Sequence, residues 1–299
     1  MGGMQTTEHI YPLFLQKGEI LMVQRIFSII VLPLLTLVAI GCSDSTGPAD
    51  GKGTVRVVMT DAPFPINLVA EANVSIERVE IRSKSADSDS GFTIVTDIDT
   101  ILNLVDLRNG ITAQLGELDL GPGIYDEIRL ITGDAEIILT DDTRFDLKVP
   151  SGSQTGIKIK IKNDLTVEEG KVVEVLLDFD LSKSFVVKGN PATPSGINGF
   201  NFKPVLRAVA TAASGRVEGT ILEGINDMPL ENTYVVLTSQ DDNEVYEAYT
   251  DDKGYFALIG LPTGLYDIAV SSDDLTTARQ ADIEVKAGEA TTIDLTLMP

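Results

Sequence analysis

The 299-residue sequence has no tryptophan, one cysteine (Cys42) and one histidine (His9), and only 6% of its residues are aromatic. A single cysteine excludes a disulfide within the chain. Because the histidine precedes every segment that is expected to fold, Ser-His-Asp and Cys-His catalysis are excluded, and so are histidine-containing metal sites. The lack of tryptophan also disfavours an aromatic platform for sugars. Enzymes that use only carboxylates, lysine or tyrosine remain open.

Basic residues are scarce as well. The chain has 23 Lys and Arg against 45 Asp and Glu, which gives a formal net charge of −22. Such a charge opposes nucleic-acid binding, because no basic surface is left to displace counterions from phosphates. It favours a soluble, self-repelling surface, whose acidic loops could collect cations.

Long hydrophobic runs are limited to one, over residues 26–40. This run is short for a bilayer span, which needs about 20 residues. With Arg25 before it and small Gly41 after it, the run is typical of a secretory signal. The sequence Ala-Ile-Gly-Cys at 39–42 resembles the lipobox of bacterial lipoproteins. The resemblance implies a diacylglycerol thioether on Cys42 and removal of residues 1–41.

A lipid on Cys42 predicts a stable membrane tether, since two or more acyl chains hold a protein firmly. Ser43, rather than Asp, follows the cysteine, which favours the outer membrane of a diderm bacterium. The alternative is a signal anchor in which the cysteine is incidental. Residues 1–21 do not fit a signal peptide, and we expect translation to start at Met22.

Residues 42–52 are small and polar and predict a flexible tether. From residue 53 on, nearly every segment alternates with period two or is β-branched, which is typical of half-buried strands. The prediction is an all-β chain of two β-sandwich domains in tandem, over residues 53–210 and 215–299. The best candidate for a helical turn is the segment 104–115, which Asn109-Gly110 should interrupt.

A weak internal repeat links the two halves. The segment LGPGIYD at 120–126 matches LPTGLYD at 261–267, and each leads directly into an expected strand. A glycine turn followed by tyrosine at a strand start indicates a tyrosine corner, in which the phenol bonds back across the turn. We therefore expect structural roles for Tyr125 and Tyr266. The first domain should also carry an additional hairpin, with Asp141-Asp142 in its turn.

Two family resemblances cover nearly the whole chain after the tether. The segment 216–298 resembles a carboxypeptidase regulatory-like domain, through TDDKGYF at 250–256 and LPTGLY at 261–266. Such domains are accessory modules of the transthyretin-like sandwich type, without chemistry of their own. Residues 53 to about 210 resemble the family called domain of unknown function 4382, through GTVRVVMTDAP at 53–63 and LDFDLSKS at 177–184. That resemblance implies no activity.

Three carboxylates are the best candidates for a ligand site. Asp178 and Asp180 lie two apart, so on a strand both point to one face, and Asp61 follows an expected strand. Two like charges side by side are costly unless they are solvated, paired or bound to a metal. A calcium site at these three residues is one hypothesis. The alternative, which we favour, is a solvated face paired with Lys158, Lys160 or Lys183, or a turn cap by Asp61.

Other polar groupings have simpler explanations. The acidic stretches 241–244 and 251–254 read as hairpin loops that cap their own turns. A serine-lysine pair of Ser151 and Lys158 has nothing in the sequence to bring it together.

The sequence thus favours a non-enzymatic, lipid-anchored protein of the cell envelope, which binds an envelope protein or glycan through sandwich loops or has a structural role. No catalytic residue and no cofactor other than possible calcium is expected. The alternatives are a carboxylate-dependent enzyme or enzyme-accessory protein acting on envelope polymers, a calcium-dependent binding module, and a structural spacer without a ligand.

Overall fold

The computed structural model describes residues 51–62, 68–86, 91–148, 155–224, 226–272 and 275–298. The expected signal peptide, Cys42 and most of the tether lie outside these residues, as does Ser151. Residues 46–299 form one compact unit. No helix in the described ranges is long and apolar enough to cross a bilayer.

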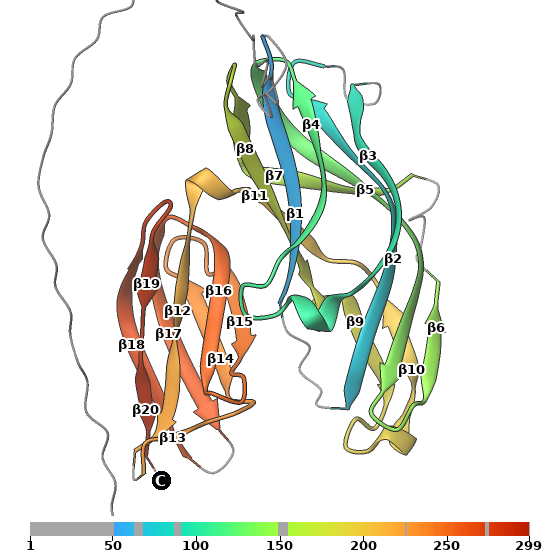
Figure 1. Cartoon of the computed structure of the whole chain (residues 1–299). Coiled ribbons are helices and arrows are strands. Elements are labelled where there is room, and N and C mark those ends of the chain that lie inside the picture. Colours follow the sequence, from blue (N-terminus) through green and yellow to red (C-terminus); the bar gives the residue numbers. More distant parts are fainter. Residues whose placement is uncertain are drawn as a thin grey trace, which may run out of the picture. The chain divides into compact units, whose positions relative to one another are not determined.

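The prediction of an all-β chain is confirmed, because strands make up nearly all of the regular structure (Figure 1). Short helical turns are the exceptions: η1 (Leu104–Leu107), α1 (Leu181–Ser184), η2 (Pro194–Gly196) and η3 (Thr211–Ala213). The strands of the first domain are β1 (Gly53–Ala62), β2 (Val69–Ser83), β3 (Phe92–Asn103), β4 (Ala113–Leu120), β5 (Gly123–Leu139), β6 (Arg144–Leu147), β7 (Ile157–Val167), β8 (Val172–Asp180), β9 (Phe185–Gly189), β10 (Ile197–Phe202) and β11 (Leu206–Ala210).

These strands form a sheet in the order β3-β2-β5-β7-β11-β8-β1-β4, with β6 added beside β5 and a separate β9–β10 hairpin. Strand β7 joins the two halves of the sheet: it pairs with β5 along much of its length and with β11 only at Ile161 and Lys162. The sheet curls, so that β4 approaches β3. At the point of approach, a methyl group on Gly116 would come within 2.6 Å of Thr96.

One continuous hydrophobic core lies inside this curled sheet. This core follows from the alternation of side chains along β1 and β8. Val55, Val57 and Met59 point inward from β1, and Val175 and Leu177 point inward from β8. Because a strand sends successive side chains to opposite faces, the intervening residues of β8 lie on the outer face of the sheet. This second face of β8 carries two of the predicted site residues.

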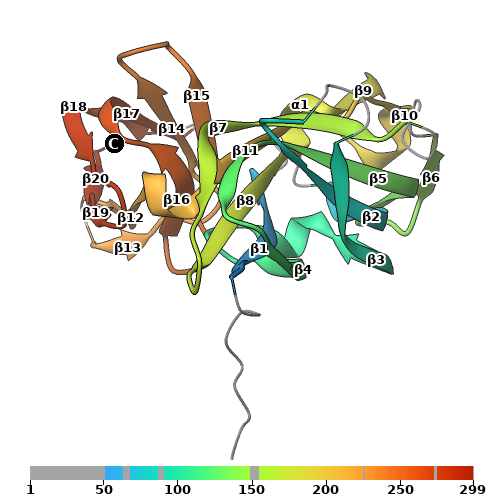
Figure 2. The same cartoon turned by 90° about the horizontal axis from the view of Figure 1, so that it is seen from above.

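The second domain has two sheets that enclose a core of its own (Figure 2). One sheet has the order β13-β12-β16, with β19 and β20 beside β12, and the other has the order β15-β14-β17-β18. Its strands are β12 (Ser214–Glu223), β13 (Met228–Pro229), β14 (Tyr234–Ser239), β15 (Val245–Tyr249), β16 (Tyr255–Pro262), β17 (Gly264–Ser272), β18 (Leu275–Val285), β19 (Ala290–Thr292) and β20 (Leu295–Leu297).

Both halves of the internal repeat form the hydrogen bond of a tyrosine corner. The phenol of Tyr125 donates to the carbonyl oxygen of Gly121 at 3.0 Å, and that of Tyr266 donates to the carbonyl oxygen of Pro262 at 2.7 Å. Both side chains are buried, and burial raises the pKa of each phenol. Each tyrosine therefore fastens the start of a strand to the turn before it.

Two turn predictions also match the structure. A hairpin joins β5 to β6, and Asp142 has a positive φ of 66° in its turn. The expected helical turn is η1, and the chain leaves it through Asn109 and Gly110, which both have positive φ. Strand β5 runs from Gly123 to Leu139 without leaving the sheet, and its pairing with β2 shifts register along the way.

Candidate functional site

Charged residues gather where the outer face of β8 meets the second domain. We call this group, made of Asp61, Asp178, Asp180, Arg207 and Glu244, the junction cluster. It lies beside a small apolar contact in which Val58, Leu176 and Val209 of the first domain pack against Ile259 of β16.

Arg207 is the centre of the junction cluster. Its Nη2 lies 2.7 Å from an oxygen of Asp178 and 3.7 Å from one of Asp180, while its Nη1 lies 3.4 Å from Oε1 of Glu244. Nη1 also donates to the carbonyl oxygen of Val245 at 3.2 Å, and the guanidinium lies 4.4 Å from the ring centre of Tyr246. Burial works to lower the pKa of Arg207, but Asp178 and Asp180 raise it. One guanidinium thus links carboxylates of both domains.

The two aspartates of β8 differ in environment. Asp178 has a raised pKa because burial outweighs the attraction of Arg207. For Asp180, which is 1% exposed, burial is also the largest influence, but hydrogen bonds from Lys183 and Ser182 outweigh it and lower the pKa. The Lys183 ammonium lies 2.7 Å from Asp180, which also accepts from the Lys183 main-chain N–H and so caps α1.

Asp61 has no such partners. Its side chain is buried, at 6% exposure, and neither carboxyl oxygen has a hydrogen-bond partner. The pKa of Asp61 is raised well above its ordinary value, first by burial and then by Asp178 and Asp180, while the Leu181 main chain and Arg108 act in the opposite direction. The turn cap that the sequence offered as one alternative is not formed with full hydrogen-bond geometry, although the Leu181 main chain acts on this carboxyl as a donor.

The sequence correctly placed Asp178 and Asp180 on one face and named Lys183 as a partner. Of the three lysines named as alternatives, Lys183 pairs with Asp180, whereas Lys160 lies 3.1 Å from Asp126 and 2.8 Å from Glu127. Lys158 lies over the ring of Phe92. Arg207 was missed, although the register places it directly opposite Asp178 on neighbouring strands.

The geometry gives the calcium hypothesis no support. Among the described residues there is no group of three or more His, Cys, Asp or Glu side chains that could hold a metal ion. Asp178 and Asp180 already have Arg207 and Lys183 as counterions, so these two carboxylates act as ion-pair partners.

Further polar contacts join the two domains around the junction cluster. Lys162 of β7 lies 3.0 Å from both Asp242 and Glu244. On another side, the Asn109 side chain donates to the carbonyl oxygen of Tyr249 at 3.3 Å and accepts from the main-chain N–H of Ala257 at 3.4 Å. The apolar contact is therefore surrounded by hydrogen bonds and ion pairs.

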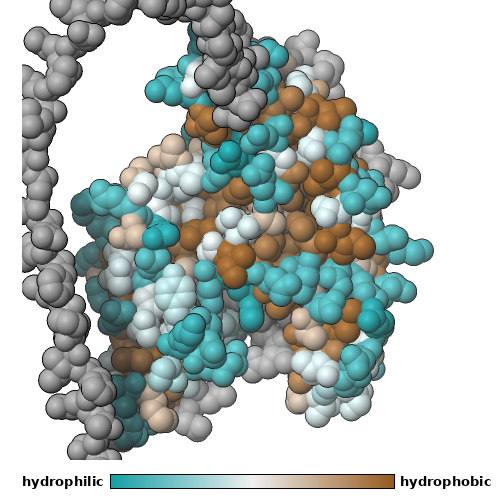
Figure 3. All heavy atoms as spheres, viewed as in Figure 1, coloured by the Kyte–Doolittle hydropathy of each residue, from teal (hydrophilic) through white to brown (hydrophobic). Residues whose placement is uncertain are grey.

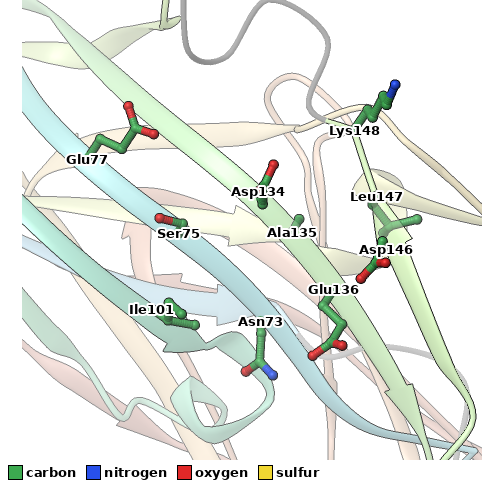
Figure 4. Close-up of a pocket in the computed structure, with 10 residues that line it drawn as sticks. All are labelled: Asn73, Ser75, Glu77, Ile101, Asp134, Ala135, Glu136, Asp146, Leu147 and Lys148. Atoms are coloured by element: carbon green, nitrogen blue, oxygen red, sulfur yellow. The ribbon is translucent and has the colours of Figure 1, made fainter.

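A second feature is a groove of about 640 Å³ on the outer face of β2, β5 and β6 (Figure 4). Four carboxylates and one ammonium group line it, with Ile101 of β3 at its edge. Ile101 is 69% exposed, more than any other large hydrophobic side chain in the described residues. The lining residues are Asn73, Ser75, Glu77, Ile101, Asp134, Ala135, Glu136, Asp146, Leu147 and Lys148.

The four carboxylates of this groove outnumber the cations near them. Glu136 and Asp146 are direct partners across β5 and β6, and like charges directly opposite each other destabilise a sheet. Arg144 lies 3.2 Å from Glu136 and offsets one of these charges. The groove was not predictable from the sequence, because the residues that line it come together only through the pairing of β2, β5 and β6.

Two family models match the chain. Domain of unknown function (DUF4382) matches residues 52–204, and the carboxypeptidase regulatory-like domain matches residues 216–298. The chain belongs to the DUF4382 family. Each match covers most of one hydrophobic core: the first core spans residues 55–210 and so extends past the first match, and the second spans 217–297. Both resemblances seen in the sequence are thereby confirmed.

No relative was found among curated proteins. Among solved structures, the shaft pilin SpaA of Lactobacillus rhamnosus GG is 12% identical with a TM-score of 0.25, over 82% of this chain and 98% of the pilin. The Bacillus anthracis TIE protein is 11% identical with a TM-score of 0.25, over 83% of this chain and 51% of that protein. The chain spans 41%, 56% and 51% of the first three matched structures. Likenesses at such TM-scores carry no functional argument.

Proposed function

We propose that this DUF4382 protein is a non-enzymatic binding protein of the cell envelope, held at the membrane by a lipid on Cys42 and acting through the groove on β2, β5 and β6. The lipobox-like sequence at 39–42 supports the anchor, and Ser43 after the cysteine supports the outer membrane. The partner is an envelope protein or glycan, and no cofactor is required.

The nature of the two modules supports a binding role rather than a catalytic one. The second domain matches the carboxypeptidase regulatory-like domain, a resemblance that implies an accessory module. Arg207 of the junction cluster is occupied by Asp178, and the neighbouring Lys183 is occupied by Asp180, while the mature chain contains no histidine. These groups link two domains, and none of them is poised as a nucleophile beside a base.

The groove is the observation that carries the proposal. It combines a volume of about 640 Å³ with an excess of carboxylates over nearby cations and with the exposed Ile101. Exposed hydrophobic residues also occur elsewhere on the first domain, whose surface in Figure 3 shows hydrophobic patches fringed by hydrophilic side chains. Partner surfaces typically combine apolar contacts with a polar rim.

The test is capture of partners from envelope extracts by the full chain. The double variant Asp134→Asn, Asp146→Asn removes two groove carboxylates, and we expect it to lose most of the material that the wild type retains. The matched control, Glu168→Gln with Glu169→Gln, removes two exposed carboxylates from the turn after β7 and should retain it. Equal capture by all three proteins would contradict a role for the groove.

A further inference from the structure

Asp61 is the one carboxylate of the junction cluster to which neither the fold nor the proposed function assigns a role. It lies at the end of β1, and it lines a cavity of about 20 Å³ whose walls come from both domains. On the second domain the cavity is lined by Tyr246 and Glu247 of β15 and by residues 257–259 of β16. A cavity of about 10–15 Å³ already has room for one water molecule, so this one admits little more.

We propose that the junction between the two domains holds Asp61 as a neutral carboxylic acid, and that loss of its proton loosens the junction. An ionised carboxylate that is buried without hydrogen bonds is far more costly than a neutral one. Neither oxygen of Asp61 has a described protein partner in full hydrogen-bond geometry, and the Leu181 main chain only partly offsets the effect of burial. The neutral acid is therefore the form that this geometry accommodates.

The charged groups around Asp61 favour the same form. Asp178 and Asp180 face it from β8, and Glu247 lines the shared cavity from β15, so that an ionised Asp61 would add a further negative charge to the group. Arg108 and Arg207 are the cations on this side. Arg207 is already engaged by Asp178 and Glu244.

Ionisation would also affect the second domain. A new carboxylate at Asp61 needs hydration, and the cavity cannot supply a full hydration shell without enlarging. Its movable walls are β15 and β16, whose contacts with the first domain are the small apolar group and a few polar bonds. Entry of water would therefore separate these strands from β1, whereas the separate cores of the two domains would stay intact.

The sign of the pH dependence follows from the raised pKa of Asp61. In the unfolded chain an aspartate loses its proton near its ordinary pKa of about 3.9, while the folded chain keeps the proton on Asp61 to higher pH. The folded state then binds more protons, so its stability falls as the pH rises from that value to the folded pKa.

The experiment compares the full chain with Asp61→Asn, which resembles the neutral acid and cannot ionise. Infrared spectra of the wild type should show the band of protonated carboxyl groups that persists from about pH 5 upward, and Asp61→Asn should lose the Asp61 part of it, leaving only the contribution of Asp178, whose pKa is also raised. Small-angle scattering should show the wild type expanding as this band disappears, while Asp61→Asn keeps constant dimensions. Asp99→Asn, which changes an exposed aspartate of β3, should behave as the wild type.

A wild type without the protonated-carboxyl band would overturn the proposal, and so would equal expansion of the wild type and Asp61→Asn. If Asp61→Asn does not fold, Asp178→Asn takes its place. Removal of the nearest anion should move the infrared titration of Asp61 to lower pH, and an unmoved titration would contradict the proposed electrostatics. Neither readout depends on a partner in the groove, so failure here is distinguishable from failure of the binding role.

Discussion

At the scale of single residues, the two tyrosine corners do the same work in both domains, but their surroundings differ. Tyr266 is 1% exposed and bonds to the half-buried Pro262, whereas the acceptor of Tyr125 is the carbonyl of the exposed Gly121. Water can replace a lost bond at an exposed carbonyl more easily than at a covered one. The two corners therefore compare the same hydrogen bond with a covered acceptor and with an exposed one.

We predict that Tyr266→Phe lowers the free energy of unfolding by about 1 kcal/mol, the net contribution of a typical hydrogen bond. Tyr125→Phe should cost less, because water can reach Gly121. Urea denaturation of the two variants and the wild type measures both effects. A larger loss for Tyr125→Phe would show that exposure of the acceptor does not control the contribution.

At the scale of elements, strand periodicity predicted the fold class. Which residues meet at each site depended on the pairing of the strands. Alternation correctly predicted that β1, β7 and β8 are strands, and it placed Asp178 and Asp180 on one face. The identity of their counterion was not readable, because it depends on β11 lying beside β8 with Arg207 opposite Asp178. The groove was hidden for the same reason.

The contact between β8 and β16 depends on a glycine. Gly260 has a φ of +70°, and a methyl group there would come within 2.6 Å of a methyl carbon of Leu176. We predict that Gly260→Ala lowers the free energy of unfolding by about 2–4 kcal/mol, from left-handed strain and from crowding. Denaturant unfolding of the full chain measures the loss.

Gly170 provides the control, because its φ is +72° and nothing lies within 4 Å of an added methyl group. Gly170→Ala should cost only the backbone strain, about 1–2 kcal/mol. Equal losses for the two variants would show that the contact with Leu176 is unimportant.

At the scale of the whole molecule, the junction cluster determines whether two domains behave as one. Their hydrophobic cores are separate, and only a small apolar group connects them. Cooperative behaviour must therefore come largely from the polar contacts, with Arg207 at their centre. With a net charge of −22, the molecule also has general repulsion to overcome at this junction.

We predict that the wild type unfolds in a single thermal transition and that Arg207→Met splits it into two. Removing one partner of a largely buried ion pair costs about 3–5 kcal/mol, because the remaining charges lose their counterion. Scanning calorimetry of the full chain distinguishes one transition from two. Arg144→Met, which removes an arginine that is 61% exposed, should leave the single transition unchanged, since exposed pairs contribute about 1 kcal/mol or less.

The position of β1 has a mechanical consequence. This strand follows the tether directly and is hydrogen-bonded on both sides, antiparallel to β4 and parallel to β8. A pull along the axis of β1 would shear the bonds to both neighbours together instead of breaking them one after another. Under such a load, the strand nearest the proposed membrane anchor is held in the geometry in which a sheet resists force best.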